Sequence, residues 1–209
     1  MNLRNGLRAF GMTMAAGVVV LTATPAAIAG TTAPAQAAGK AGTTADVAKR
    51  HDAARSNLLP DWPFDGEPCG DVMIRSRANN QFVSAEVGYT GNVSGMLRAR
   101  SGGAGHWERF SLCSRDGFDT LYSYGAMNYV SAELYHTNAD YGMLRARSNS
   151  VGPWEKFDIT CGKSDCTIRS LANGKYVGAE LYYPGTNYGM LRARSDSAGP
   201  WEKFSISVF

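Results

Sequence analysis

The stretch GMLRARS occurs three times in the chain, at 95–101, 142–148 and 189–195. Successive copies begin 47 residues apart in both cases, so no insertion or deletion separates them. A tryptophan and a phenylalanine follow each copy at the same offset: Trp107, Trp154 and Trp201, then Phe110, Phe157 and Phe204. Repetition at a fixed period indicates one structural unit used three times. Counted back from the C-terminus, the units are 69–115, 116–162 and 163–209.

Each unit carries four short strand patterns, which in the third unit lie at 167–170, 175–181, 189–195 and 203–208. Apolar and polar residues alternate within them, as strands with one buried face require. In the third pattern this alternation turns Leu191 and Ala193 inward and Arg192 and Arg194 outward. Between the first two patterns, Asn173-Gly174 predicts a two-residue hairpin turn.

Four strands in each of three units make twelve, and three blades are too few for the usual propeller. The sequence therefore predicts an all-β protein of the β-trefoil class, in which six strands close a barrel and three hairpins cap one end. Each buried apolar side chain contributes about 1.5–3 kcal/mol, and the tryptophans would add to the total. The predicted core triplets are Ile74/Leu121/Ile168, Val83/Val130/Val177, Leu97/Leu144/Leu191 and Phe110/Phe157/Phe204.

The N-terminus has the order of a secretory signal peptide. Arg4 and Arg8 precede an apolar run over 10–21, and small residues follow, with cleavage predicted after Ala29 or Ala37. The expected location is secreted and extracellular. Without residues 1–37 the net charge falls from +3 to about +1, which argues against nucleic acid as a partner. No other stretch is long and apolar enough for insertion into a membrane.

Residues 38–68 form an N-terminal extension outside the repeat. Part of it, at 44–58, has an amphipathic helical pattern, although a mobile leader is the competing interpretation for 38–56. Residues 59–64 are predicted to be extended, with their aromatic rings packed across the barrel.

The four cysteines of an exported chain meet an oxidising environment, and three pairings are open to them. The trefoil topology makes the strands of Cys161 and Cys166 hairpin neighbours and places those of Cys69 and Cys113 side by side. It therefore predicts the disulfides Cys69–Cys113 and Cys161–Cys166. Because the histidines are scattered and no CxxC pair occurs, neither a metal nor a cofactor is expected.

The pattern NGKYVGAEL, GMLRARS, GPWEKF resembles the fascin-like (actin-crosslinking-like) family of β-trefoil domains, over 69–209 and in all three units. In animals this resemblance implies actin bundling by several trefoils on one cytosolic chain, which a single trefoil behind an export signal does not match. For a secreted bacterial type it implies a carbohydrate-binding module. The QxW triplets of ricin-type lectins are absent from the sequence, so their sugar sites are not carried over.

No motif for a nucleophile, a metal or a nucleotide points to an enzyme. Two glutamates repeat threefold, as Glu86/Glu133/Glu180 and Glu108/Glu155/Glu202, but a catalytic pair must converge on one cleft. We expect each glutamate to pair with an outward arginine of its own hairpin. The arginine pairs Arg98/Arg100, Arg145/Arg147 and Arg192/Arg194 are then expected to form a solvated face.

The candidate ligand site is the tyrosine-rich connection between the second and third strands of units two and three. A tyrosine ring presents a flat apolar face beside a hydroxyl, and nearby amides and carboxylates can orient a sugar. Unit one has Gly88 and Ser94 where unit two has tyrosines. For Tyr141 and Tyr188, the competing interpretation is that they cover the barrel mouth and bind no ligand. The candidate residues are Glu133, Tyr135, Asn138, Asp140 and Tyr141, and Glu180, Tyr182, Tyr183, Asn187 and Tyr188.

The sequence thus favours a secreted, non-enzymatic, lectin-like monomer that binds polysaccharide or another glycan through shallow repeated sites, which gain by avidity on a polymer. The alternative is a protein-binding trefoil whose partner is a secreted or surface protein, such as a protease inhibitor or a fascin-like adhesion module. The uniform repeat argues against the single long loop that an inhibitor would present.

Overall fold

The computed structural model describes residues 69–115 and 117–209. The signal peptide, the extension and its helix, all predicted above, lie outside these residues. Within the described part of the chain, no helix has the length and apolar character needed to cross a membrane.

The described residues contain four strands in each unit, as predicted. Short 3₁₀ turns separate several of them. The strands are β1 (Cys69–Ser76), β2 (Phe82–Glu86), β3 (Met96–Ser101), β4 (Arg109–Arg115), β5 (Phe118–Ser123), β6 (Asn128–Glu133), β7 (Met143–Ser148), β8 (Phe157–Cys161), β9 (Cys166–Ser170), β10 (Tyr176–Glu180), β11 (Met190–Ser195) and β12 (Phe204–Val208). The 3₁₀ turns are η1 (Gly91–Val93), η2 (His106–Glu108), η3 (Asn138–Asp140), η4 (Pro153–Glu155), η5 (Gly185–Asn187) and η6 (Pro200–Glu202).

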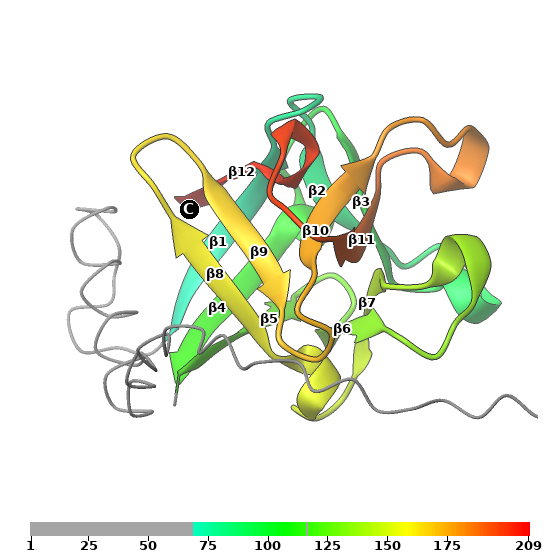
Figure 1. Cartoon of the computed structure of the whole chain (residues 1–209), viewed down its shortest axis with the longest axis horizontal. Coiled ribbons are helices and arrows are strands. Elements are labelled where there is room, and N and C mark those ends of the chain that lie inside the picture. The colour runs from blue at the N-terminus through cyan, green and yellow to red at the C-terminus, as the bar shows by residue number, and fades with distance from the viewer. Residues whose placement is uncertain (1–68, 116) are drawn as a thin grey trace, which may run out of the picture. The chain divides into compact units, whose positions relative to one another are not determined.

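Six strands form a closed ring of antiparallel pairs, in the order β1, β4, β5, β8, β9, β12 and back to β1. The hairpins β2–β3, β6–β7 and β10–β11 lie together at one end of this ring (Figure 1). Single bridges join β3, β7 and β11 to one another. A six-stranded barrel capped by three hairpins is a β-trefoil, so the predicted fold class is confirmed.

The core consists of equivalent side chains from the three units. All twelve predicted core residues are at most 1% exposed. Met96, Met143 and Met190 form a second buried cluster where the three hairpins meet. The tryptophans do not join the core, however. Trp107, Trp154 and Trp201 lie on η2, η4 and η6 and are 38–52% exposed, while the phenylalanine three residues later turns into the barrel.

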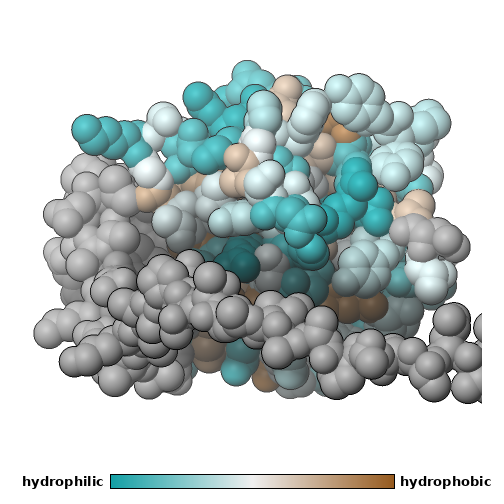
Figure 2. Space-filling model, in the orientation of Figure 1, coloured by the Kyte–Doolittle hydropathy of each residue, from teal (hydrophilic) through white to brown (hydrophobic). Residues whose placement is uncertain are grey.

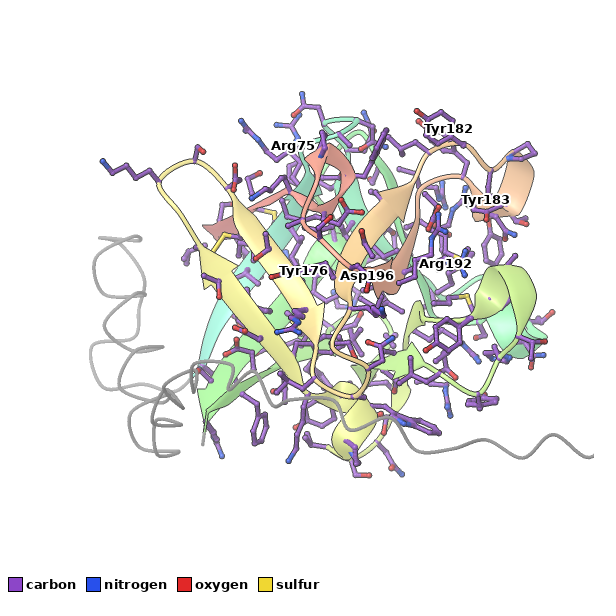
Figure 3. All side chains as sticks on the ribbon, in the orientation of Figure 1. Arg75, Tyr176, Tyr182, Tyr183, Arg192 and Asp196 are labelled. Carbon is purple, nitrogen blue, oxygen red and sulfur yellow. A yellow bond between two sulfur atoms is a disulfide. The ribbon has the colours of Figure 1, made fainter. Side chains whose placement is uncertain are left out.

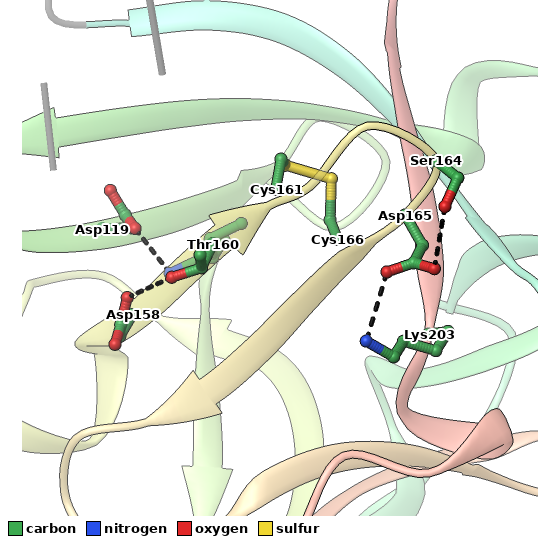
Figure 4. Close-up of a disulfide and its surroundings, with 9 residues drawn as sticks. Asp119, Asp158, Thr160, Cys161, Ser164, Asp165, Cys166 and Lys203 are labelled. Carbon is green, nitrogen blue, oxygen red and sulfur yellow. Dashed lines mark hydrogen bonds and ion pairs between the residues drawn. A yellow bond between two sulfur atoms is a disulfide. The ribbon is translucent and has the colours of Figure 1, made fainter. Parts of the chain in front are cut away.

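Both predicted disulfides are present. Cys69 lies opposite Cys113 in the β1–β4 pair, and Cys161 lies opposite Cys166 in the β8–β9 hairpin. Figure 4 shows the second disulfide at the tip of its hairpin, where Asp165 also forms an ion pair with Lys203 at 3.2 Å.

The turn at Asn173-Gly174 is longer than predicted. The Ser170 N–H donates to the Lys175 carbonyl, which leaves the four residues 171–174 in the connection. The Asn173 side chain explains the larger loop, because its amide donates to the Ala193 carbonyl on β11 and its oxygen accepts the Lys175 N–H. The asparagine therefore ties the turn to the neighbouring hairpin.

The three hairpins meet at glycines that begin the GMLRARS stretches. Gly95, Gly142 and Gly189 have φ of 75–76°, a region that favours glycine. A Cβ on Gly142 would lie 2.5 Å from the Ala193 carbonyl oxygen, and the Ala193 N–H donates to the Gly142 carbonyl at 2.7 Å. The same contacts join Gly95 to Ala146 and Gly189 to Ala99. The backbone of each unit is thus in direct contact with the backbone of another unit.

Replacement of Gly142 by alanine is expected to destabilise the fold by at least about 3 kcal/mol, because the positive φ and the clash with the Ala193 carbonyl add together. Gly91→Ala is the matched control. It has a φ of +65° with open space around the Cβ position, so only about 1–2 kcal/mol should be lost. Urea unfolding of both variants measures the difference. Equal losses would show that the contact between units adds nothing.

Candidate functional site

The first arginine of each GMLRARS pair is buried, and this corrects the prediction of a solvated arginine face. Each of these guanidinium groups donates to backbone carbonyls in the connection of another unit. Arg98 Nε donates to Tyr188 O at 2.7 Å, Arg145 Nε to Ser94 O at 2.9 Å, and Arg192 Nε to Tyr141 O at 2.9 Å. Arg98 and Arg145 also donate through Nη2 to the carbonyl at the start of a 3₁₀ turn, Gly185 and Gly91 respectively. These hydrogen bonds therefore fix the backbone of each connection between the second and third strands of a unit.

The second arginine of each pair points outward and bonds a buried glutamate of its own hairpin, as predicted. Arg147 donates through Nε and Nη2 to Glu133. Arg100 with Glu86 and Arg194 with Glu180 repeat the arrangement. The hydrogen bond to Glu133 raises the pKa of Arg147, so the folded state binds this proton more tightly, and the stabilisation is lost only when the pH rises above the usual arginine pKa. Glu133 and Glu180 thus serve mainly to hold their hairpins.

One aromatic position in each connection points inward. Tyr89 accepts a hydrogen bond from Arg98 Nη1 at 2.7 Å, and Tyr183 lies 3.5 Å from Arg192 Nη1. Figure 3 shows Tyr183 beside Arg192, with Tyr182 farther out on the connection. Unit two has His136 instead, whose buried Nε2 has no hydrogen-bond partner and lies 3.7 Å from Glu133 Oε2. Tyr183 is therefore half-buried beside Arg192, and its ring is not part of the exposed surface of the connection in the way that Tyr182 is.

The residue before this position carries an exposed ring that meets a tryptophan. Tyr182 is 83% exposed and stands edge-on to Trp201, with ring centroids 5.8 Å apart. Tyr135 is 55% exposed and stacks on Trp154 at 5.7 Å, with an angle of 28° between the planes. Sequence reasoning found both tyrosines but assigned the tryptophans to the core. Their constant offset from GMLRARS was the available signal for a shared surface role.

A buried glutamate holds each tryptophan in place. Glu155 Oε2 accepts the Gly152 N–H at 2.7 Å across η4, and Glu202 Oε2 accepts the Gly199 N–H at 2.8 Å across η6. Glu108 does the same for Gly105 in η2. The prediction that these three glutamates pair with hairpin arginines was therefore wrong, because they close the 3₁₀ turns that present the tryptophans.

Unit three has a pocket of about 420 Å³ between β10, β11 and η6. Tyr182 and Trp201 line it together with the carboxylates of Glu180 and Glu202 and the Gly178 backbone. The volume is within the range of sites for small ligands. On the face in Figure 2 the described surface is mostly hydrophilic to neutral, and strongly hydrophobic residues occur only in small patches.

The other candidates lie elsewhere on the connections. Tyr183, Asn187 and Tyr188 do not line the unit-three pocket, although Glu180 and Tyr182 do. The backbone carbonyls of Tyr141 and Tyr188 accept the buried arginines, and both rings are partly exposed. Asp140 and Asn187 are half-buried at the ends of η3 and η5, and the side chain of Asn138 lies outside the described part of the structure.

Unit one lacks the aromatic pair. Gly88 occupies the position of Tyr135 and Tyr182, so Trp107 has no tyrosine beside it at that position. Trp107 instead packs on Gly125, where an added Cβ would lie 2.7 Å from the indole Cδ1. The described units therefore present two tyrosine–tryptophan pairs and one unaccompanied tryptophan.

No known family model matches the chain, and no curated protein matches it in sequence. Its fold does resemble solved structures. The designed threefold-symmetric protein ThreeFoil is 15% identical, with a TM-score of 0.56 over 67% of this chain and 99% of that one. The Rhizoctonia solani agglutinin is 12% identical, with a TM-score of 0.54 over 68% of this chain and 96% of that one.

A third neighbour, the exo-β-1,3-galactanase 1,3Gal43A from Clostridium thermocellum, is 13% identical, with a TM-score of 0.56 over 71% of this chain. This chain spans only 31% of the galactanase. At such identities the likeness concerns the fold alone, and it agrees with the strand pairing. The chain is a β-trefoil protein.

Arg147→Met is expected to destabilise unit two by about 3–5 kcal/mol, because it leaves the fully buried Glu133 carboxylate without its main partner. Adding Glu133→Gln should recover part of this loss, since the group left behind is then neutral. Urea unfolding of the two single variants and the double variant gives the coupling energy. A coupling near zero would contradict the assigned role of the pair.

Proposed function

We propose that this protein is a secreted, non-enzymatic carbohydrate-binding module. Polysaccharide would bind at two places, Tyr182 with Trp201 in unit three and Tyr135 with Trp154 in unit two. The observation that carries the proposal is the pairing of exposed rings from two separate segments in each of these units.

Sugars offer two kinds of surface, and the pairs match both. The C–H groups of a sugar ring form a flat apolar face that packs on tyrosine and tryptophan rings, while the tyrosine hydroxyl and the indole N–H can meet sugar hydroxyls. The supports beneath the rings are rigid. Buried arginines hold the connections, and buried glutamates close the tryptophan turns. Because little is ordered on binding, the entropic cost is small.

Fold likeness adds modest support. An agglutinin and a galactan-degrading enzyme are among the structural neighbours, but a fold is shared by many functions. The two disulfides agree with an oxidising, extracellular environment. Absence of catalysis is part of the proposal, because the repeated glutamates already hold arginines or cap turns.

Two sites on one rigid body suit a repeating polymer. Each site is open and buries little of a sugar, so each alone should bind weakly. Once one site is engaged, the second meets the same chain at high effective concentration, which raises the overall affinity. The wild-type protein should therefore bind a polymer more tightly than short oligosaccharides.

Retention on insoluble cellulose, chitin, xylan, galactan and β-1,3-glucan tests the proposal. We expect retention on at least one of them, weakened about tenfold or more by Tyr182→Ala with Trp201→Ala or by Tyr135→Ala with Trp154→Ala, and lost in the quadruple variant. Trp107→Ala is the matched control, because it removes the unaccompanied tryptophan and should leave retention unchanged. Failure to bind any polymer, or full retention by the quadruple variant, would refute the proposal.

A further inference from the structure

The second and third units differ at the floor of their sites. In unit two, Ser131 Oγ donates to Glu155 Oε1 at 2.5 Å, so both carboxylate oxygens of Glu155 are hydrogen-bonded within the protein. The equivalent position in unit three is Gly178, which has no hydroxyl. Glu202 Oε2 accepts the Gly199 N–H, but Oε1 has no hydrogen-bond donor among the described residues.

The absence of a side chain at Gly178 also changes the shape of the site. A Cβ on this glycine would lie 2.6 Å from Glu202 Oε1, so the carboxylate occupies space that a serine would fill. Both residues line the 420 Å³ pocket, beneath Tyr182 and Trp201. Although Glu202 is buried as a residue, its Oε1 therefore remains accessible from a cavity with aromatic walls. A carboxylate oxygen is a strong acceptor, and the hydroxyl of a bound sugar could donate to it.

The charges around the pocket indicate a neutral ligand. Glu180 is paired with Arg194, and Asp196 at the rim is paired with Lys175. The remaining charges are those of Glu202 and of Arg192, which lies 3.9 Å from Glu180. These charges balance, so the pocket offers no net attraction to an anionic or a cationic sugar.

Resting on the function proposed above, we infer that the two sites are not equivalent. The unit-three pocket binds one residue of a neutral saccharide, with a sugar hydroxyl donating to Glu202 Oε1 between Tyr182 and Trp201. Unit two is a shallower platform, because Ser131 already occupies the corresponding acceptor. Selectivity among sugars therefore resides in unit three, while unit two contributes stacking.

A reciprocal exchange of glycine and serine tests this inference. Gly178→Ser should consume the acceptor of unit three as Ser131 does in unit two, and Ser131→Gly should free the acceptor of unit two. Each substitution is made in a variant that retains only the site it affects. Gly178→Ser is combined with Tyr135→Ala/Trp154→Ala, which remove the unit-two site. Ser131→Gly is combined with Tyr182→Ala/Trp201→Ala, which remove the unit-three site. Affinity electrophoresis uses soluble galactan, mannan, laminarin and hydroxyethylcellulose as neutral probes, with polygalacturonate and chitosan as charged ones.

With its background variant as reference, Gly178→Ser should weaken binding to a neutral polymer about tenfold or more, as expected for a lost hydrogen bond to a charged group. Ser131→Gly should strengthen it. Neither charged polymer should be preferred over the neutral ones. Because serine is native at the equivalent positions 84 and 131, Gly178→Ser should fold, and its melting temperature verifies this. Gly178→Ala, which narrows the pocket without a hydroxyl, should also weaken binding.

The outcomes separate the two proposals. If Tyr182→Ala/Trp201→Ala weakens binding in the otherwise wild-type chain while Gly178→Ser does not in its background, the inference about Glu202 is wrong and the carbohydrate function stands. A preference for polygalacturonate or chitosan would also overturn the inference. If no polymer is bound by any variant or by the wild type, both proposals fail.

Discussion

Hydrogen bonds from three buried arginines hold together the end of the barrel that the three hairpins cap. Arg98, Arg145 and Arg192 each reach from their own unit into the connection of another, and the three contacts close a cycle around the pseudo-threefold axis. The acceptors are backbone carbonyls, so the interaction constrains the path of the connection and leaves its side chains free to vary. A buried guanidinium needs several acceptors to offset its desolvation, and the 3₁₀ turns supply them. The exposed rings of Tyr135 and Tyr182 are displayed on connections held in this way.

Much of the fold could be predicted from the sequence because it depends on period and alternation. A 47-residue repeat without insertions implies equivalent structure in each unit, and period-two alternation identified the barrel-facing residues such as Val177 and Leu191. The disulfides then followed from strand order. These inferences need only the local pattern and the topology, and the buried positions and strand registers agree with them.

The predictions that were wrong concern side chains whose burial depends on a part of the protein outside their own strand. Alternation correctly set Arg192 on the face opposite Leu191, but that face is covered by another unit where the hairpins meet, and one strand's pattern cannot show this. The tryptophans were expected to add to the core, yet the 3₁₀ turn closed by Glu202 holds Trp201 outside the barrel. The asymmetry at Gly178 is readable in the sequence as a departure from Ser131, although its meaning depends on the position of Glu202.

The closed ring of strands has a consequence for how such a chain can be assembled. β1 and β12 are paired neighbours, with Val72 opposite Val208, so the two ends of the trefoil lie side by side. No strand pair depends on where along the ring the polypeptide begins. If these ends were joined and the chain were opened at another junction between units, every strand pairing and both disulfides would be preserved. The strand pairing is thus compatible with circular permutation at the junctions between units.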